Sequence, residues 1–244
     1  MNRYYYDLHL HSCLSPCGDA DNTPNNLAGM GKLAGLQIMA LTDHNTCRNC
    51  PAFFEAAARY GVIPVPGMEL STAEDIHMVC LFPALEAAMA FDVAVEARRV
   101  RIGNRPDIFG EQQIMDGEDR VIGEEPFLLS NATEIPLEES VRLAAQYGGI
   151  AYPAHVDRPS NSILAVLGTM PPEPRFSCVE LHDGRREAEL SDAVGGPAVR
   201  TVVGSDAHYL WDIRDRDRFL LLEAAPEDGD GVRQNLIAWL RGDV

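Results

Sequence analysis

Six of the seven histidines in this 244-residue chain stand at the ends of short apolar segments, and most of them have a carboxylate close by. The six are His9, His11, His44, His77, His155 and His208, and the neighbouring acids are Asp7, Asp43, Glu69, Asp157 and Asp206. A single histidine beside an apolar segment is usually a structural residue. Repeated pairs of imidazole and carboxylate are typical of metal sites, because both groups bind divalent ions. The pattern therefore predicts one polynuclear metal centre.

The apolar segments before these residues have the length and composition of buried β-strands. Side chains two positions apart on a strand point to the same face, so His9 with His11, and Asp206 with His208, each form a pair. Strand-like and helical segments alternate along the chain, which favours an α/β fold with a mainly parallel sheet. If the strands form a barrel, their C-terminal ends meet at one rim, and we expect the metal site there.

His77 differs from the other histidines because it precedes its apolar segment, residues 78–82. Only seven residues, 70–76, separate it from Glu69. A parallel crossover needs roughly a dozen residues or more. The spacing therefore predicts an antiparallel connection that returns His77 to the rim where Glu69 lies.

Five motifs follow one another in the chain: DLHLHS at 7–12, LTDHNT at 41–46, GMELS at 67–71 with His77 after it, AHVDR at 154–158 and GSDAH at 204–208. Their order resembles the polymerase and histidinol phosphatase (PHP) family, from residue 4 to about residue 210. The resemblance implies a distorted TIM-like (β/α)7 barrel with mainly parallel strands and a metal site at the C-terminal rim. It also implies phosphoesterase activity. We expect one such domain over residues 1–244, with an insertion at about 101–136 where no clear periodicity is found, lying over the mouth of the site.

The resemblance also implies a set of metal ligands. A first ion would be held by His9, His11, Glu69 and Asp206. Glu69 would bridge to a second ion bound by His77 and His155. A third would take His44, His208 and an acid from the loop after the first strand.

That last acid departs from the family pattern. Family members commonly carry Asp or His five or six positions after the second histidine, where this chain has Pro16 and Cys17. Counting back from Pro24, which is placed to start the next helix, favours Asp19. Asp21 and a thiolate of Cys17 are the alternatives.

The mixed imidazole and carboxylate set suits two or three divalent transition metal ions, zinc, manganese or iron, among which ligand type alone does not choose. A water that bridges two ions would become the hydroxide that attacks phosphorus. Arg158, three residues after His155, is a candidate catalytic residue that binds phosphate oxygens. Asp43 is the other candidate catalytic residue, and with Ser12 it is expected to orient the metal ligands.

The net charge of −17 argues against extended binding to nucleic acid, which needs clustered lysine and arginine. We therefore expect a small phosphomonoester substrate, either a nucleotide or a phosphorylated metabolite, and no stable nucleic-acid partner. The alternatives are an exonuclease acting on short oligonucleotides and a non-catalytic metal-binding module. Without a stretch of about twenty apolar residues or a recognisable signal peptide, we expect no membrane partner and a cytoplasmic location. The sequence leaves the oligomeric state open.

The six cysteines are more typical of reduced thiols than of disulfides. One alternative is a separate four-thiolate zinc site made by Cys13, Cys17, Cys47 and Cys50.

Overall fold

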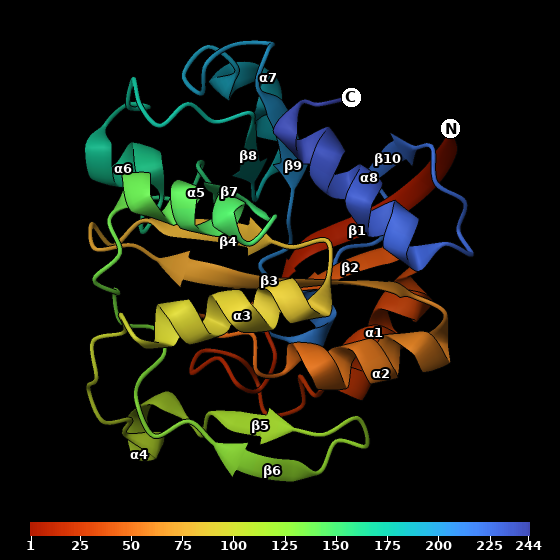
Figure 1. Cartoon of the computed structure of the whole chain (residues 1–244), viewed down its shortest axis with the longest axis vertical. Coiled ribbons are helices and arrows are strands. Elements are labelled where there is room, and N and C mark those ends of the chain that lie inside the picture. The colour runs from red at the N-terminus through yellow and green to blue at the C-terminus, as the bar shows by residue number, and fades with distance from the viewer.

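The computed structural model describes residues 1–244 and contains a curled sheet with helices around it (Figure 1). Six strands form the main sheet in the order β10-β1-β2-β3-β4-β7. Their bounds are Phe219–Leu222 (β10), Asn2–Leu10 (β1), Ile38–Leu41 (β2), Ile63–Ser71 (β3), His77–Leu81 (β4) and Ile150–Pro153 (β7). A parallel pair, β8 (Cys178–Leu181) and β9 (Arg200–Val203), continues the curl.

The curled wall closes through few backbone contacts. At one junction the Val156 amide after β7 donates to the Glu180 carbonyl of β8 at 2.8 Å. At the other, Leu10 of β1 forms an isolated parallel bridge with Ala207 after β9, and the His11 amide donates to the Ala207 carbonyl at 3.0 Å. One interior is thus surrounded by seven strands, β1, β2, β3, β4, β7, β8 and β9. This confirms the predicted distorted TIM-like barrel.

The strand directions do not confirm the mainly parallel detail. The pairs β1–β2, β2–β3 and β8–β9 are parallel, whereas β1–β10, β3–β4 and β4–β7 are antiparallel. The physical reason lies largely in β4, which follows β3 after a short turn and therefore runs against both of its neighbours. The register pairs Ser71 with His77, so the predicted antiparallel connection is confirmed.

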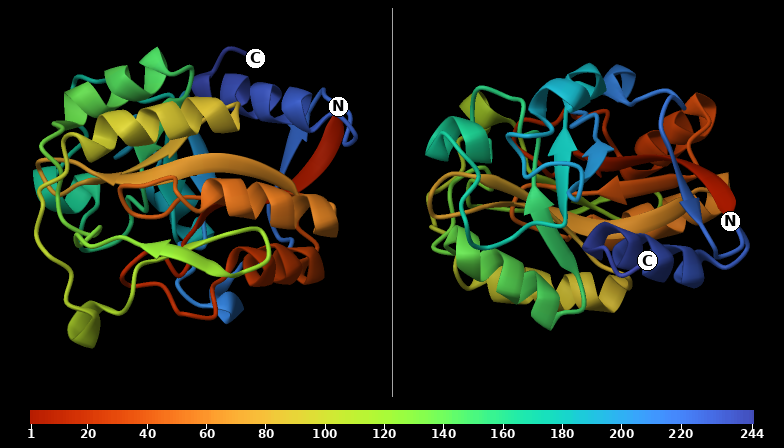
Figure 2. Two further views of the ribbon diagram at one scale, coloured as in Figure 1. Left: turned by 60° about the horizontal axis from the view of Figure 1, so that its bottom comes forward. Right: turned by 90° about the horizontal axis from the view of Figure 1, so that it is seen from above.

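The helices pack on the outer face of the sheet and over one end of the barrel. The outer ones are α1 (Pro24–Ala34), α2 (Cys50–Tyr60), α3 (Leu85–Glu96), α5 (Leu137–Gln146) and α6 (Ile163–Leu167), and their apolar faces share one core cluster with the sheet. A second cluster fills the interior and is closed by α8 (Gly229–Arg241) at the end where the strands begin (Figure 2). The opposite end, where β1 and β2 finish, is left for polar residues.

A register shift in β1 sets the direction of the side chains of His9 and of His11, which directly follows the strand. Tyr4, Tyr6 and Leu8 belong to the interior cluster, while Leu10 belongs to the outer one, and the pairing of β1 with β2 shifts between Asp7 and Leu10. A bulge changes the face to which the following side chains point. It therefore lets an apolar strand end in polar ligands that face the barrel axis.

The segment expected as an insertion contains α4 (Pro106–Phe109) and the hairpin of β5 (Gln113–Met115) and β6 (Val121–Glu124). The hairpin lies beside α1 and α2 (Figure 2), where Asn49 accepts from the Met115 amide and Asn25 donates to the Gly117 carbonyl. No residue of 101–136 lines the polar pocket described below, so this segment supports the surrounding loops and does not cover the mouth. Among the helices of the protein, none combines the length and hydropathy that crossing a membrane requires.

Candidate metal centre

The structure brings together eight of the nine residues predicted as metal ligands. Three overlapping groups have their donor atoms within 4.8 Å of one another: His9, His11, Glu69 and Asp206; His44, Glu69 and His77; and His11, His44 and His208. His155 joins them through Glu69. The roles of these residues in metal binding remain a proposal, but their convergence at one rim is a property of the fold.

Glu69, near the end of β3, lies at the middle of the cluster and is almost completely buried. Its Oε1 lies 2.9 Å from His77 Nδ1, 3.1 Å from His155 Nε2 and 3.3 Å from His9 Nε2. Its Oε2 lies 3.0 Å from His44 Nδ1 and 3.3 Å from His11 Nε2. One carboxylate thus faces five imidazoles, which is the arrangement expected of a bridging ligand.

The donor spacings fit metal ions. His9 Nε2 and His11 Nε2 are 3.2 Å apart, and Asp206 Oδ1 is 3.4 Å from the first and 3.0 Å from the second. Two ligands bound 2.0–2.1 Å from one ion are about 3.0 Å apart at right angles and about 3.4 Å apart in a tetrahedron. His44 Nδ1 and Glu69 Oε2, although 3.0 Å apart, are both left without a hydrogen bond. The two atoms are close together but do not form a hydrogen bond with each other. This is the arrangement expected of two ligands that face a shared ion.

Charge compensation is visible in the acids and imidazoles of the cluster. Burial raises the pKa of Glu69, but the surrounding histidines, among them His9, outweigh it and hold that pKa well below the usual value. Burial lowers the pKa of His11, yet a hydrogen bond to Asp206 and the nearby carboxylate of Glu69 raise it to about 9. The acids therefore attract positive charge to this rim.

Two other imidazoles of the cluster, those of His44 and His208, are held in the neutral form. Burial lowers the pKa of His44 to about 4, and burial together with the nearby charge of His11 lowers that of His208 to about 3. Neutral imidazoles have a free lone pair, which is the form that binds metals.

Sequence reasoning missed Glu180 of β8, which orients two predicted ligands. Its Oε1 lies 2.8 Å from His9 Nδ1 and accepts from the His155 amide at 3.2 Å. Carboxylates that bind the second ring nitrogen of a histidine ligand fix its tautomer and orientation. A lone acid in the apolar strand Cys178–Leu181 was the available signal.

Asp43 does not line the polar pocket described below, which favours its expected role in orienting ligands over a catalytic one. Its fully buried carboxylate accepts from the Ser12 amide and hydroxyl at 2.7 and 2.6 Å, and from the Ser15 hydroxyl at 2.7 Å. The Ser15 hydroxyl is also 3.0 Å from His11 Nδ1. Asp43 thus acts on His11 through Ser15, a residue that the sequence did not indicate.

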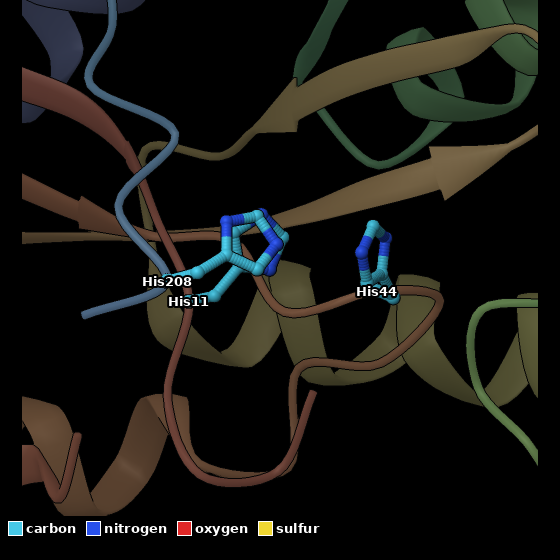
Figure 3. A group of neighbouring side chains, drawn as sticks. All are labelled: His11, His44 and His208. Carbon is cyan, nitrogen blue, oxygen red and sulfur yellow. The ribbon is translucent and has the colours of Figure 1, made fainter. Parts of the chain in front are cut away.

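Asp19 is the predicted ligand that the structure does not place in the cluster. Its carboxylate accepts from the Asp21 amide at 2.9 Å, and Asp21 is exposed. Another side chain of this loop, Cys17, contacts the three-histidine group instead, since its Sγ lies 3.2 Å from His44 Nε2. Figure 3 shows that group, with His11 and His208 beside each other and His44 facing them. The sequence did not reveal this arrangement, because the loop conformation is set in part by hydrogen bonds with distant residues such as His208.

Arg158 stands at the edge of the polar pocket formed by this cluster. The pocket has a volume of about 110 Å³ and is lined by His44, Glu69, His77, His155, Arg158, Ser160, Asn161, Asp206 and His208. Arg158 Nη1 lies 2.6 Å from Asp206 Oδ2, and Nη2 donates to His182 Nδ1 at 3.3 Å. The guanidinium is 35% exposed, so it is accessible from the mouth.

The proposed four-thiolate zinc site does not form. Cys13 packs with Ala52 and Met115, whereas Cys47 and Cys50 lie beside the Gly67 carbonyl. All six cysteines are free thiols.

A model of the PHP domain matches residues 7–152, so this chain belongs to the PHP domain family. The family inferred from the motifs is confirmed, and with it the predicted metal-binding hydrolase and phosphoesterase class at the level of the family. Among known relatives, a 5'-3' exoribonuclease from Haemophilus influenzae is 31% identical over 121 residues, which cover 46% of this chain and 43% of that protein. The chain therefore spans less than half the length of the curated relatives it matches.

Solved structures share the fold across nearly the whole chain. A lesion-specific endonuclease from Pyrococcus furiosus has a TM-score of 0.64 at 17% identity and covers 99% of this chain and 56% of its own. A complex of endonuclease Q with a 27-mer duplex has the same TM-score at 16% identity, with coverage of 99% and 57%. An amidohydrolase from Chromobacterium violaceum has a TM-score of 0.57 at 19% identity, with coverage of 94% and 96%.

These comparisons contradict the expectation of a small substrate without a nucleic-acid partner. One relative is an exoribonuclease and one structural neighbour holds a DNA duplex. The prediction relied on the net charge of the whole chain, which bears on extended binding along a polynucleotide and does not describe the few side chains around a metal centre.

Proposed function

We propose that this protein is a metal-dependent phosphoesterase that hydrolyses short oligonucleotides. The observation that carries the proposal is the convergence of six imidazoles and two carboxylates in one cluster, four of whose imidazoles line a polar pocket together with Arg158. Divalent ions bound there would polarise the phosphate ester and lower the pKa of a water molecule.

The donor set suits two or three ions. His9, His11, Glu69 and Asp206 would hold the first, and Glu69, His77 and His155 the second. His44 and His208 would belong to the third. Imidazole and carboxylate ligands suit zinc, manganese or iron, so metal identity requires measurement.

The pocket favours a phosphate group over a whole small molecule. Its volume of about 110 Å³ is well below the roughly 300 Å³ at which small-molecule sites begin. The rest of a substrate would therefore lie outside, along the rim. Arg158 is placed to bind two phosphate oxygens, because a guanidinium presents paired donors.

The charge of the chain bears on substrate length. A long polynucleotide is held mainly by lysine and arginine along its backbone, and the net charge here is −17. A short oligonucleotide needs only local contacts near the scissile phosphate. The relative named as an exoribonuclease supports RNA as the first substrate to examine.

The test is hydrolysis of 5'-phosphorylated single-stranded RNA and DNA oligonucleotides by protein reconstituted with zinc or manganese. We expect cleavage that stops when the ions are removed by a chelator and that is absent in His9→Ala. A metal-loaded protein that cleaves neither oligonucleotides nor a small phosphodiester would refute the proposal.

A further inference from the structure

We propose that Cys17 supplies a thiolate ligand to the third metal position of this centre, beside His44 and His208. The inference rests on the proposed metal centre and concerns a residue that departs from the family pattern. Its starting observation is the 3.2 Å between Cys17 Sγ and His44 Nε2.

The loop around Cys17 is fixed on both sides by hydrogen bonds to the site. Before it, the Ser15 carbonyl accepts from the Gly18 amide at 2.9 Å, and the Ser15 hydroxyl contacts His11. After it, the Asp19 amide donates to the His208 carbonyl at 2.9 Å. The thiol is therefore held at the cluster and is not a side chain of a free loop.

Gly18 makes this conformation possible. A methyl group at that position would collide with the Ser12 carbonyl oxygen, so the chain turns back closely on itself after Cys17. The close turn keeps Sγ on the same side as the three imidazoles.

The three histidines provide the other donors. Ligand atoms of His11, His44 and His208 lie within 4.8 Å of one another (Figure 3), and His44, which is 95% buried, has its Nε2 beside Cys17. A sulfur and a nitrogen on one tetrahedral zinc are about 3.6 Å apart, from bond lengths of 2.3 and 2.0–2.1 Å. A small outward shift of Cys17 meets that geometry.

The ligand type has a chemical consequence. Thiolate is a softer donor than the carboxylate or imidazole common at this position, and soft donors favour zinc over manganese. The first two positions have only nitrogen and oxygen donors. The centre would therefore have one zinc-selective position beside two less selective ones.

The test is reconstitution of the full-length protein with cobalt(II), followed by absorption spectroscopy and elemental analysis. We expect a near-ultraviolet thiolate-to-cobalt charge-transfer band that is lost in Cys17→Ala, together with one ion per chain. Cys13→Ala is the matched control, because this neighbouring buried thiol lies outside the cluster and should leave the band intact. Cys17→Asp should retain the ion, lose the band and shift the preference of that position toward manganese.

A charge-transfer band that persists in Cys17→Ala would overturn the inference, as would its absence from wild-type protein that carries three cobalt ions. The proposed function fails separately, when the loaded protein hydrolyses no phosphate ester.

A second, independent observation concerns the residues that follow His208, and it deepens the proposed function on which it rests. We infer that Tyr209 and Trp211 form a stacking surface for a nucleobase. Their rings are stacked with centroids 4.8 Å apart and planes at 13°, yet they are 41% and 74% exposed.

Leu210 explains how both rings come to face outward. It packs against the outer core cluster and anchors the short turn Leu210–Asp212, which leaves its two neighbours in solvent. An exposed aromatic pair next to a residue of the pocket is suited to binding a base, because every base presents a π-face. His208 lines the pocket and directly precedes Tyr209 in the chain, so the aromatic pair begins one residue after the pocket.

Tryptophan fluorescence tests this directly, because the chain has only two tryptophans. Trp239 lies in α8 under the guanidinium of Arg200, so Trp239→Phe leaves Trp211 as the sole reporter. Titration of metal-loaded Trp239→Phe with a cleavage-resistant phosphorothioate oligonucleotide should quench its emission. An abasic strand of equal length should not.

Kinetics supply the second readout. Trp211→Ala should raise KM for an oligonucleotide roughly five- to a hundred-fold and leave hydrolysis of a small phosphodiester unchanged. Unquenched emission with an unchanged KM would overturn the inference while leaving the proposed function intact.

Discussion

Glu180 Oε1 lies 2.8 Å from His9 Nδ1, and both side chains are completely buried. The contact joins β8 to β1, although 171 positions separate the two residues. It directs the other ring nitrogen of His9 toward Glu69 and Asp206, which lie 3.3 and 3.4 Å away. Glu180 therefore orients the proposed ligand His9 and is not itself one of the proposed metal ligands.

We expect Glu180→Ala to weaken zinc binding by about 10- to 100-fold, the usual cost of losing the carboxylate behind a histidine ligand. Glu180→Gln should fall between this variant and the wild type, because it keeps an oxygen acceptor for His9. Competition with a chromophoric chelator measures the affinity, and circular dichroism checks the fold. Equal zinc affinity in all three proteins would show that the contact is only structural.

Gly204 leaves the space in which Glu180 and His9 meet. A methyl group at position 204 would collide with the Glu180 carboxylate and lie 2.9 Å from His9 Cβ. Gly204→Ala should therefore displace Glu180 and lower zinc affinity in the same direction as Glu180→Ala. Gly103→Ala is the matched control, because nothing lies within 4 Å of a methyl group there. If Gly204→Ala binds zinc like the wild type, this close packing does not position the ligand.

His9→Ala or Asp206→Ala should reduce both metal content and hydrolysis, because each removes a donor from the group shared with His11 and Glu69. His182→Ala should retain its metals, since His182 contacts the centre only through Arg158. Elemental analysis of the reconstituted proteins gives the answer. Wild-type protein with less than one ion per chain would contradict the metal centre.

Arg158→Ala should raise KM or lower kcat while the ions stay bound. Loss of a charge-assisted phosphate contact costs roughly 1.5–3 kcal/mol, about one to two powers of ten in kcat/KM. Metal binding should persist because Asp206 Oδ1 faces His11, whereas Arg158 contacts Oδ2. The control is Arg175→Ala, an 87% exposed arginine whose ion pair is with Glu173. Wild-type kinetics in Arg158→Ala would make this arginine a surface charge only.

Metal affinity should increase with pH. In the metal-free protein the pKa of His11 is raised to about 9, because the hydrogen bond to Asp206 and the nearby carboxylate of Glu69 outweigh the lowering effect of burial. An ion must displace this proton, so zinc binding releases protons below that pH and strengthens as pH rises toward it. Calorimetry in buffers of different ionisation enthalpy measures the release. Proton uptake on binding would reverse the predicted sign.

The motifs indicated which side chains converge at this rim where those residues lie on a strand or shortly after its end. The link between Glu69 and His77 is so short that only an antiparallel pair satisfies it, and β3 and β4 pair in that way. Asp19 lies outside the cluster, and the path of its loop depends on a hydrogen bond to the His208 carbonyl, which no local pattern reveals. Glu180 was missed because its partner is distant in sequence. The mainly parallel sheet was not confirmed, since alternation of strands and helices does not fix the directions of β4 and β10.

The barrel has two seams, after β7 and after β9, where backbone hydrogen bonds are few. The ligands span one of them: His9 belongs to β1, and Asp206 follows β9. An ion bound by both residues would link β1 to the segment after β9, across a seam that has few backbone hydrogen bonds. Binding that is specific to the folded chain stabilises it by about 4 kcal/mol when the free ion is at a thousand times its dissociation constant. The stability of the closed barrel would then depend on the concentration of free metal ions. Loss of the ions would lower the free energy of unfolding as well as abolish hydrolysis.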